Sequence, residues 1–258
     1  MKQKVLLAIP AYRCEKQIIR TLDEIDDTLA HRVEEIAVID NGSPDNTVHA
    51  ALEYKKSGRL KNLHVYQNVK NYSLGGTHKV AFLKGQAMGC THVVILHGDN
   101  QAKSDEANLL LDYALAHPET QTVLGSRFSK GSHLQGYDWK RIWGNRLLNI
   151  AYTVFTGRKC TDLGSGLNVF ALKDLEQRTY LEFADKLTFN FELLLDLIKR
   201  KIRFAYVPIT WREEDQVSNA RNFNIAKIAG VNLLRWRLGL LKYPQARSTE
   251  DYACKEIS

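Results

Sequence analysis

The sequence has no apolar stretch long enough to span a membrane, and its first apolar run, Val5–Ile9, is too short for a signal peptide. Its four cysteines form no CxxC pair and no histidine cluster accompanies them, which argues against a disulfide framework or a zinc site. No repeat, low-complexity segment or clear linker interrupts the 258 residues. We therefore expect a single domain that folds in the cytoplasm and keeps its thiols reduced.

Acidic residues are few in two parts of the second half, whereas the first half is electrically neutral. Residues 130–160 hold six basic side chains and one acidic, and residues 199–237 hold nine basic and three acidic. Such concentrated positive charge is typical of proteins with an anionic partner, such as a phosphate group, an acidic membrane surface or a nucleic acid. Nucleic acid fits least, because no known binding motif accompanies the charge and the aromatic residues are not interleaved with it.

Short apolar runs alternate with helical stretches through the first half of the sequence. We expect strands at residues 5–9, 36–39, 63–66 and 93–96, and helices at about residues 15–29, 45–56, 75–88 and 105–116. The apolar runs are continuous, as in strands buried on both faces, so the predicted fold class is α/β with a mostly parallel central sheet flanked by helices. Ligands of such sheets bind at the carboxyl ends of the strands.

The second half of the sequence is less regular. We expect strands at residues 122–124, 167–171 and 204–209, a loop at 131–136, and helices at 139–155, 187–199 and 223–238. On the helix at 139–155, apolar side chains that include Trp139, Trp143 and Leu147 share one side. Either this side packs on the sheet, as in most amphipathic helices, or it lies at a lipid interface. The sequence leaves both alternatives open.

One carboxylate, Asp99, follows a predicted strand in the segment His97-Gly98-Asp99-Asn100-Gln101. Mg²⁺ and Mn²⁺ prefer oxygen ligands and are often held by few carboxylates together with the phosphates of a substrate. We therefore interpret Asp99 as a metal ligand at the end of the strand. A turn or helix N-cap role for this aspartate is the alternative, because Gly98-Asp99-Asn100 also suits a turn.

Further sequence blocks lie at or next to other strands of the predicted sheet. They are Pro10-Ala11-Tyr12-Arg13, Asp40-Asn41-Gly42-Ser43 ahead of Asp45-Asn46-Thr47, Gly125-Ser126-Arg127, Thr161-Asp162-Leu163-Gly164-Ser165-Gly166 and Val207-Pro208-Ile209-Thr210-Trp211-Arg212. In this order the blocks resemble family 2 glycosyltransferases with the GT-A fold, in the branch similar to dolichol- and polyprenyl-phosphate sugar synthases. The resemblance implies a GT-A-like, Rossmann-like domain at residues 1–220 and a helical extension at 221–258.

The resemblance assigns a nucleotide-sugar donor to the loops at the strand ends. The first loop contacts the nucleotide, Asp40 contacts the base or ribose, and a glycine-rich segment after the third strand lies near the donor. Asn41 stands where a second aspartate is common, and Gly75 with Gly76 also suits a simple helix start. The implied donor site is Pro10, Ala11, Tyr12, Glu15, Asp40, Asn71, Gly76, Lys79, Gly98 and Asp99.

The metal motif of the family, Asp-x-Asp, is replaced here by His97-Gly98-Asp99, so its first carboxylate is missing. The resemblance implies that Asp99 holds Mg²⁺ or Mn²⁺, that Gln101 assists, and that oxygens of the donor diphosphate complete the shell of the metal. His97 is a further candidate ligand, and a hydrogen-bonded histidine at the strand end is the alternative. The metal neutralises the charge that develops on the leaving nucleoside diphosphate.

Three residues of the second half are candidates for catalysis, namely Arg127, Asp162 and Arg212. Arginine grips phosphate oxygens in a fork, which is the role we expect for both arginines, with surface or structural ion pairs as the alternative. Asp162 is a candidate general base. A polyprenyl phosphate acceptor is already ionised at neutral pH, however, so Asp162 has the alternatives of orienting the acceptor, orienting an arginine or capping a turn.

Together these features predict an inverting glycosyltransferase that moves a sugar from a UDP- or GDP-sugar to a membrane-associated acceptor, with polyprenyl phosphate expected first. A hydroxyl of a surface glycan is the alternative acceptor. A non-catalytic nucleotide-sugar-binding protein is the alternative class, because the metal motif has lost one carboxylate. We expect the protein in the cytoplasm, with contact to the inner face of the membrane, and the sequence indicates no oligomeric state.

Overall fold

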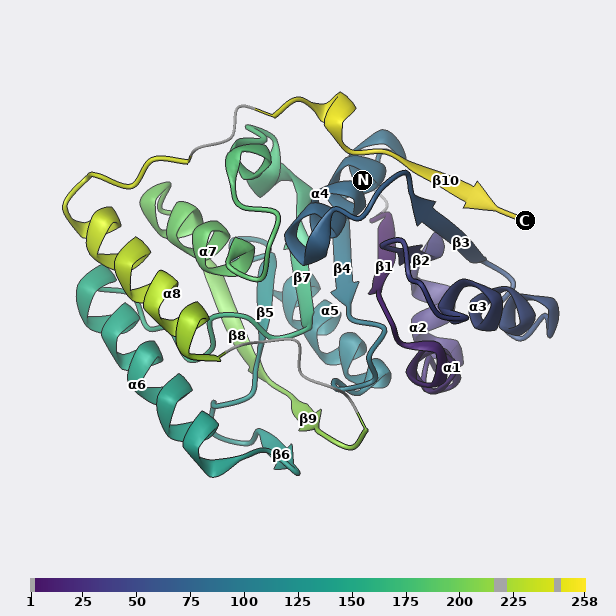
Figure 1. The fold of residues 1–258 in the computed structure, drawn as a ribbon, viewed down its shortest axis with the longest axis horizontal. Coiled ribbons are helices and arrows are strands. Elements are labelled where there is room, and N and C mark those ends of the chain that lie inside the picture. The colour runs from purple at the N-terminus through teal and green to yellow at the C-terminus, as the bar shows by residue number, and fades with distance from the viewer. Residues whose placement is uncertain (1–2, 216–221, 244–246) are drawn as a thin grey trace.

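The computed structural model describes residues 3–215, 222–243 and 247–258 and contains one eight-stranded sheet in the order β10-β3-β2-β1-β4-β7-β5-β8 (Figure 1). Its strands are β1 Val5–Ala11, β2 Glu35–Asp40, β3 Leu63–Asn68, β4 His92–Leu96, β5 Thr122–Ser126, β7 Leu167–Ala171, β8 Phe204–Pro208 and β10 Cys254–Ile257. A second, two-stranded sheet pairs β6 His133–Gln135 with β9 Thr210–Arg212. In the large sheet β7 and β10 run antiparallel to their neighbours and the other pairs are parallel. The prediction of one α/β domain with a mostly parallel central sheet is confirmed.

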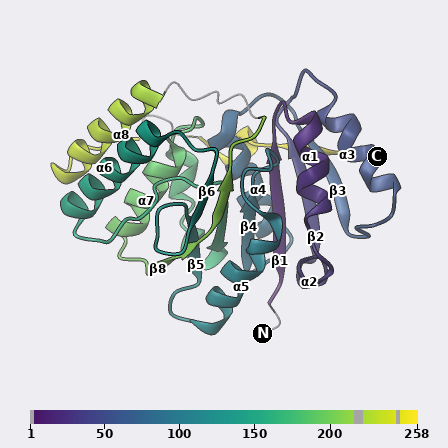
Figure 2. The ribbon, with the colours of Figure 1, turned by 90° about the horizontal axis from the view of Figure 1, so that it is seen from below.

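Helices cover both faces of the large sheet (Figure 2). The helices α1 Glu15–Asp23, α2 Asp27–Arg32, α3 Thr47–Lys56 and α5 Ala107–Ala116 pack on one face, in a core that includes Leu7 and Ile9 of β1. The helices α4 Ser73–Ala87 and α7 Phe189–Lys199 pack on the other face, with Leu6 and Ala8, and this core extends to α6 Trp139–Thr156 and α8 Asn222–Arg237. Short 3₁₀ helices occur at Ser104–Glu106, Leu172–Leu175, Thr179–Glu182 and Thr249–Asp251. Alternate residues of β1 therefore enter two different cores, as expected for a strand buried on both faces.

The prediction of one helix over residues 15–29 is wrong. α1 ends at Asp23, and α2 begins after Asp26, whose carboxylate accepts a hydrogen bond of 2.7 Å from the backbone N–H of Leu29. An aspartate that caps a new helix start competes with continuation of the preceding helix. The predicted loop at 131–136 also contains the short strand β6, whose partner β9 lies far away in the sequence.

The apolar side of α6 faces solvent. Between 59% and 71% of the surface is exposed on five of its apolar side chains, which are Trp139, Trp143, Leu147, Ile150 and Val154. The alternative in which this side packs on the sheet is therefore wrong. The other side of α6 is anchored, since the buried Tyr152 donates a hydrogen bond of 3.0 Å to the carbonyl of Ala229 in α8. Both views show α6 and α8 side by side at one end of the molecule (Figures 1 and 2).

The C-terminal region returns to the far edge of the sheet. After α8 the chain crosses to β3, where β10 pairs with it in antiparallel register (Figure 1). The region that we predicted as a helical extension is therefore part helix and part sheet strand. The predicted boundary between residues 220 and 221 lies outside the described residues. In the part of the chain that the structure describes, no helix combines the length and apolar character needed to cross a bilayer.

Candidate functional site

The carboxyl ends of β1, β2 and β4 are adjacent in the sheet, and backbone hydrogen bonds link the loops that follow them. The N–H of Asn41 donates to the carbonyl of Ala11 at 2.9 Å. The N–H of Gly98 donates to the carbonyl of Pro10 at 2.9 Å. The structure thus brings together the predicted nucleotide loop, the residues after β2 and the predicted metal motif, although they are far apart in the sequence.

Asp40, the last residue of β2, is fully buried and has only one of its two carboxylate oxygens paired. Its Oδ2 accepts hydrogen bonds from the backbone N–H groups of Gly42 and Ser43 at 2.9 and 3.0 Å. Gln67 Nε2 adds a third bond to the same oxygen at 3.1 Å. Its Oδ1 is buried and has no hydrogen-bond partner within the described residues. An unpaired buried acceptor costs about 1–3 kcal/mol, so a ligand N–H or O–H would be stabilising at this oxygen.

The first loop leaves its polar side chains accessible beside Asp40. Tyr12 has 38% of its surface exposed, and the guanidinium carbon of Arg13 lies 5.4 Å from the centre of its ring. Arg13 adopts a φ of 53°, and its N–H donates to Ser43 Oγ at 3.0 Å, which joins the loops after β1 and β2. Glu15 begins α1 and accepts a hydrogen bond of 3.4 Å from Asn46. The contacts of Tyr12 and Glu15 with a donor stay a prediction.

Asp99 lies in a tight turn directly after β4. Gly98 lets the chain pass close to α1, because a Cβ at this position would lie only 3.1 Å from an isoleucine side chain of that helix. Asn100 then adopts a φ of 55°, and the N–H of Gln101 donates to Asp99 Oδ1 at 3.3 Å. Burial raises the pKa of the Asp99 carboxyl, so an isolated negative charge is disfavoured here. A divalent cation would offset that cost.

The side chains of this turn that could bind a metal carry oxygen atoms. Asp99 has a carboxylate and Gln101 a side-chain carbonyl, and both kinds of group suit Mg²⁺ or Mn²⁺. Across residues 3–215, 222–243 and 247–258, no three or more His, Cys, Asp or Glu side chains gather closely enough to hold a metal ion. A cation bound at Asp99 would therefore take further ligands from substrate and water.

His97, which replaces the first carboxylate of the family motif, forms a hydrogen bond with a histidine of α4. Its Nε2 lies 3.1 Å from Nε2 of His78 in α4, a residue that the sequence analysis did not select. Burial lowers the pKa of both imidazoles, so the pair is neutral at pH 7 and one Nε2–H donates to the other nitrogen. This arrangement matches the hydrogen-bonded histidine that was the alternative to a metal ligand, and it leaves Nε2 of His97 occupied.

Arg127 and Asp162 form a buried bidentate ion pair. Nε and Nη2 of Arg127 each donate to one carboxylate oxygen at 2.7 Å. The backbone N–H groups of Arg127 and Gly164 add bonds of 2.9 and 3.1 Å, so each oxygen accepts two hydrogen bonds. Nη1 of Arg127 makes no hydrogen bond with a described residue. The geometry matches the alternative in which Asp162 orients an arginine, and it leaves no carboxylate oxygen open to take a proton as a general base.

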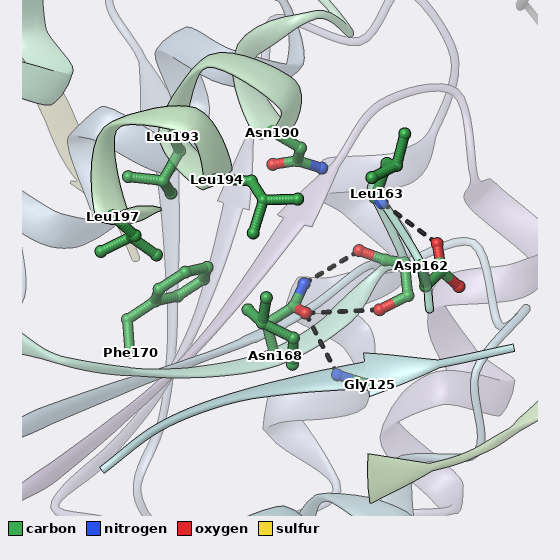
Figure 3. Close-up of a pocket in the computed structure, with 12 residues that line it drawn as sticks. Gly125, Asp162, Leu163, Asn168, Phe170, Asn190, Leu193, Leu194 and Leu197 are labelled. Carbon is green, nitrogen blue, oxygen red and sulfur yellow. Dashed lines mark hydrogen bonds between the residues drawn. The ribbon is translucent and has the colours of Figure 1, made fainter. Parts of the chain in front are cut away.

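A small cavity of about 20 Å³ lies behind this pair, between β5, β7 and α7 (Figure 3). It has room for about one water molecule. Asn168 bridges its polar wall, because Nδ2 donates to the carbonyl of Ser165 at 2.9 Å and Oδ1 accepts from the N–H of Gly125 at 3.2 Å. The cavity is far too small for a sugar nucleotide, and the bridge fixes the segment after Asp162 against β5.

Arg212 is tied to α1. Its two terminal nitrogens donate to the two carboxylate oxygens of Glu24, each at 2.8 Å. Its backbone N–H donates to the carbonyl of Gln101 at 2.8 Å, so β9 supports the loop that follows Asp99. The structure therefore gives Arg212 the structural ion pair that was the alternative to a phosphate contact.

Gly76 and Lys79 differ most from their predicted role at the donor. Gly76 is buried, and a Cβ there would lie 2.5 Å from Cβ of Tyr72, so this glycine permits close packing of α4, and its contact with a donor stays a prediction. Lys79 has no exposed surface, and its ammonium donates to two backbone carbonyls, to the Asp185 carboxylate at 2.8 Å and to the Tyr252 hydroxyl at 2.9 Å. With four partners Lys79 cannot reach a donor in this conformation, and the prediction for Lys79 is corrected on this ground.

Asn71 lies at the edge of the site. Its Oδ1 accepts a hydrogen bond of 3.0 Å from Nδ2 of Asn41, the residue that replaces a second aspartate. Oδ1 of Asn41 accepts from the N–H of Tyr72 at 2.8 Å and from Asn68 at 3.0 Å. Asn41 therefore braces the segment before α4, and this bracing role explains an amide at this position, since an amide both donates and accepts.

Comparison with known proteins identifies a family and several relatives. The family described as Glycosyl transferase family 2 matches residues 7–178. UDP-N-acetylglucosamine–dolichyl-phosphate N-acetylglucosaminyltransferase of Methanococcus voltae is 24% identical over 246 residues, which cover 91% of this chain and 96% of the relative. A dolichyl-phosphate beta-glucosyltransferase of Trichomonas vaginalis is also 24% identical, over 90% of this chain and 72% of the relative.

Solved structures share the fold. Glucosyl-3-phosphoglycerate synthase from Mycobacterium tuberculosis in complex with uridine-diphosphate superposes with a TM-score of 0.66 at 19% identity, over 93% of this chain and 82% of that chain. The complex of the same synthase with Mn²⁺ and UDP-glucose has a TM-score of 0.67 at 17% identity, over 98% and 86%. These neighbours have the GT-A fold, and the family match spans well over half of the sequence. The chain belongs to glycosyl transferase family 2.

Proposed function

We propose that the protein transfers one sugar from a UDP- or GDP-sugar to a polyprenyl phosphate, with inversion at the anomeric carbon. The observation that carries the donor half is the unpaired, buried Oδ1 of Asp40, two strands from Asp99 at the same edge of the sheet. The two dolichyl-phosphate transferases that align with almost the whole chain support the acceptor half. Inversion needs one displacement, in which an acceptor oxygen attacks the face of the sugar carbon opposite the leaving diphosphate.

The donor would lie across the ends of β1, β2 and β4. Asp40 Oδ1 would accept a hydrogen bond from the base or ribose, which removes the cost of a buried unpaired acceptor. Pro10, Ala11 and Tyr12 would border the nucleotide, because their loop is bonded to the loops after β2 and β4. The diphosphate would then extend toward Asp99.

Asp99 and Gln101 would hold Mg²⁺ or Mn²⁺ together with oxygens of the donor diphosphate. When bound, this cation neutralises the negative charge of the leaving nucleoside diphosphate. Because His97 brings no charge to the site, the protein itself offers a single carboxylate. We therefore expect the metal to bind weakly without donor.

Among the three candidate catalytic residues, Arg127 is the one best placed to bind a phosphate group. Asp162 holds its guanidinium by Nε and Nη2, and Nη1 remains for an oxygen of the acceptor or the donor. A polyprenyl phosphate is ionised at neutral pH and needs no strong base for its attack, which agrees with a carboxylate already filled by four hydrogen bonds. Asp162 is therefore proposed as a positioning residue.

The exposed apolar side of α6 supports a site of action at a membrane surface. Its two tryptophans and neighbouring Leu147 are 64–70% exposed, and basic residues flank them. Beside it, Leu234 of α8 and Leu238, directly after α8, are also 52% and 62% exposed. Apolar side chains edged by lysine and arginine bind the interface of an anionic bilayer without spanning it. We propose contact with the cytoplasmic leaflet.

Transfer assays with and without lipid test this function. Radiolabelled UDP- and GDP-sugars would be incubated with Mn²⁺ and polyprenyl phosphate in vesicles, and the label extracted with the lipid would be counted. Asp99→Ala should abolish labelling, whereas Asp105→Ala, a matched control half exposed to solvent, should retain it. Label on a glycan hydroxyl in place of lipid would favour the alternative acceptor. Donor binding by thermal shift without any transfer would favour the non-catalytic binding protein.

A further inference from the structure

An open groove of about 380 Å³ lies between α6 and residues 159–161. Its walls combine apolar side chains, which include Phe128, Ile150 and Val154, with two basic side chains, Arg146 and Lys159. None of these residues was selected as part of the donor site, and the groove lies on α6 away from the ends of β1, β2 and β4. Its chemistry therefore points to a second ligand.

The floor of the groove is firmly held. Nδ2 of the buried Asn149 donates to the carbonyl of Thr161 at 2.7 Å. One turn further along α6, Thr153 Oγ1 accepts a hydrogen bond of 3.0 Å from the N–H of Cys160. Ser129 Oγ also donates to Thr161 Oγ1 at 3.0 Å. These bonds attach residues 160–161 to the helix, so the groove exists before any ligand binds.

The two basic side chains of the groove have no partner among the described residues. Arg146 and Lys159 are exposed, and neither makes a hydrogen bond or ion pair with a residue that the structure describes. By contrast Arg141, five residues before Arg146, donates to both carboxylate oxygens of Glu213 at 2.6 Å. From residue 139 to residue 160 the sequence has five basic residues and no acidic one. The groove thus has two positively charged side chains and no acidic residue among those that line it, so it suits an anionic ligand.

Two residues that line the groove are sequence neighbours of the Arg127–Asp162 pair. Phe128 in its wall follows Arg127 directly, and Thr161 in its floor precedes Asp162 directly. An anion held by Arg146 and Lys159 would therefore lie near the two backbone segments that carry Arg127 and Asp162. The groove thus adjoins the chain segments of the residues proposed to meet the acceptor.

The outer end of the groove opens onto the exposed apolar side of α6. Ile150 and Val154 line the groove and also have 59% and 71% of their surfaces exposed. Leu147, 70% exposed, continues this surface toward Trp143. A ligand that fits both ends is an amphiphile with a phosphate at one end and a hydrocarbon chain at the other, since each part would meet matching chemistry.

We propose that this groove binds the polyprenyl phosphate acceptor, with its phosphate on Arg146 and Lys159 and its first isoprene units on Ile150 and Val154. The inference rests on the proposed function and deepens it by assigning the acceptor to particular residues. It commits the groove to the acceptor lipid and not to the headgroups of bulk phospholipids.

Two basic-to-neutral substitutions test the assignment. We expect Arg146→Ala with Lys159→Ala to raise the KM for polyprenyl phosphate in vesicles by at least about tenfold, because two charge-assisted contacts are lost. The dissociation constant for the nucleotide-sugar should not change. Lys140→Ala is the matched control, since Lys140 is basic, exposed and on the same helix but lies over the ring of Trp139 at 5.7 Å and not in the groove. All variants alter exposed side chains, so their melting temperatures should match that of the parent protein.

Vesicle sedimentation separates the possible failures. The parent protein should bind phosphatidylcholine vesicles containing polyprenyl phosphate more tightly than vesicles containing an equal charge of phosphatidylglycerol, and the double variant should lose that preference. Equal binding to both vesicles by the parent protein, or an unchanged KM in the double variant, would overturn the groove assignment while leaving transfer intact. Preferential binding with no transfer of any sugar would support the groove and overturn the proposed enzymatic function.

Discussion

Replacing Asp162 by asparagine tests how the ion pair with Arg127 works. The substitution keeps the size of the side chain but removes its charge and turns one acceptor atom into a donor. Asp162 accepts four hydrogen bonds, of which the two from the guanidinium are 2.7 Å long. The amide would face Arg127 N–H groups with its own N–H group, so a buried guanidinium would remain without its partner.

The size of the effect follows from burial. The side chains of Arg127 and Asp162 are only 11% and 1% exposed, so water cannot replace the lost interaction. Removing one member of a buried pair costs about 3–5 kcal/mol. For a domain of this size, 1 kcal/mol corresponds to a shift of about 2–4 °C, so we expect Asp162→Asn to lower Tm by roughly 6–20 °C.

Urea unfolding followed by circular dichroism gives the free energy of unfolding. The control is Asp215→Asn, because the ion pair of Asp215 with Arg20 is 39–40% exposed and should contribute less than about 1 kcal/mol. The activity of Asp162→Asn and Arg127→Met should fall by similar factors, and the double variant should lose no more than either alone. An Asp162→Asn protein as stable as the parent but with a strongly pH-dependent kcat would refute the positioning role and restore the general base.

Three further outcomes follow from buried groups. His97→Asp should raise the affinity of the donor-free protein for Mn²⁺ by at least about tenfold, because it adds a second carboxylate beside Asp99. Electron paramagnetic resonance measures this affinity, and an unchanged value would contradict the metal assignment. Burial lowers the pKa of His92 to about 4, so the unfolded chain binds an extra proton between pH 6.5 and 4 and stability falls as the pH falls through this range. Between pH 7 and pH 5, His92 should lower the free energy of unfolding by about 2 kcal/mol. Urea unfolding at the two pH values should show that the His92→Gln variant lacks this part of the decrease. Lys79→Met should lower the free energy of unfolding by about 3 kcal/mol and leave the donor dissociation constant, measured by calorimetry, unchanged; weaker donor binding in a stable variant would return Lys79 to the donor site.

Local sequence patterns predicted most strands of the large sheet and most helices. The apolar runs from residue 5 and from residue 93 are strands because continuous apolar residues are needed to enter two cores. The break between α1 and α2 escaped prediction because Asp26 can continue a helix or cap a new one, and only packing decides. The strands β6, β9 and β10 were missed because each is short and depends on a partner strand far away in the sequence.

Sequence patterns also located the site but not the partners of its side chains. Asp40 and Asp99 were selected because polar residues directly after buried strands meet at one edge of a parallel sheet. Arg212 was misjudged because its partner Glu24 is 188 residues away, and a motif contains no information about such a contact. The bond between His78 and His97 was missed for the same reason, since nothing local distinguishes His78 from other residues on the inner side of α4.

The strand β10 has a consequence for the order in which the domain is completed during synthesis. It covers the edge of β3, and the N–H of Ala253 just before it donates to the Tyr72 hydroxyl at 3.1 Å, beside the donor loops. Every other described strand leaves the ribosome before β10 does. Until then β3 presents an open edge, the kind of surface on which strands of other chains add and aggregate. A nascent or truncated chain that ends before residue 254 should therefore depend on a chaperone or a low concentration to stay in solution.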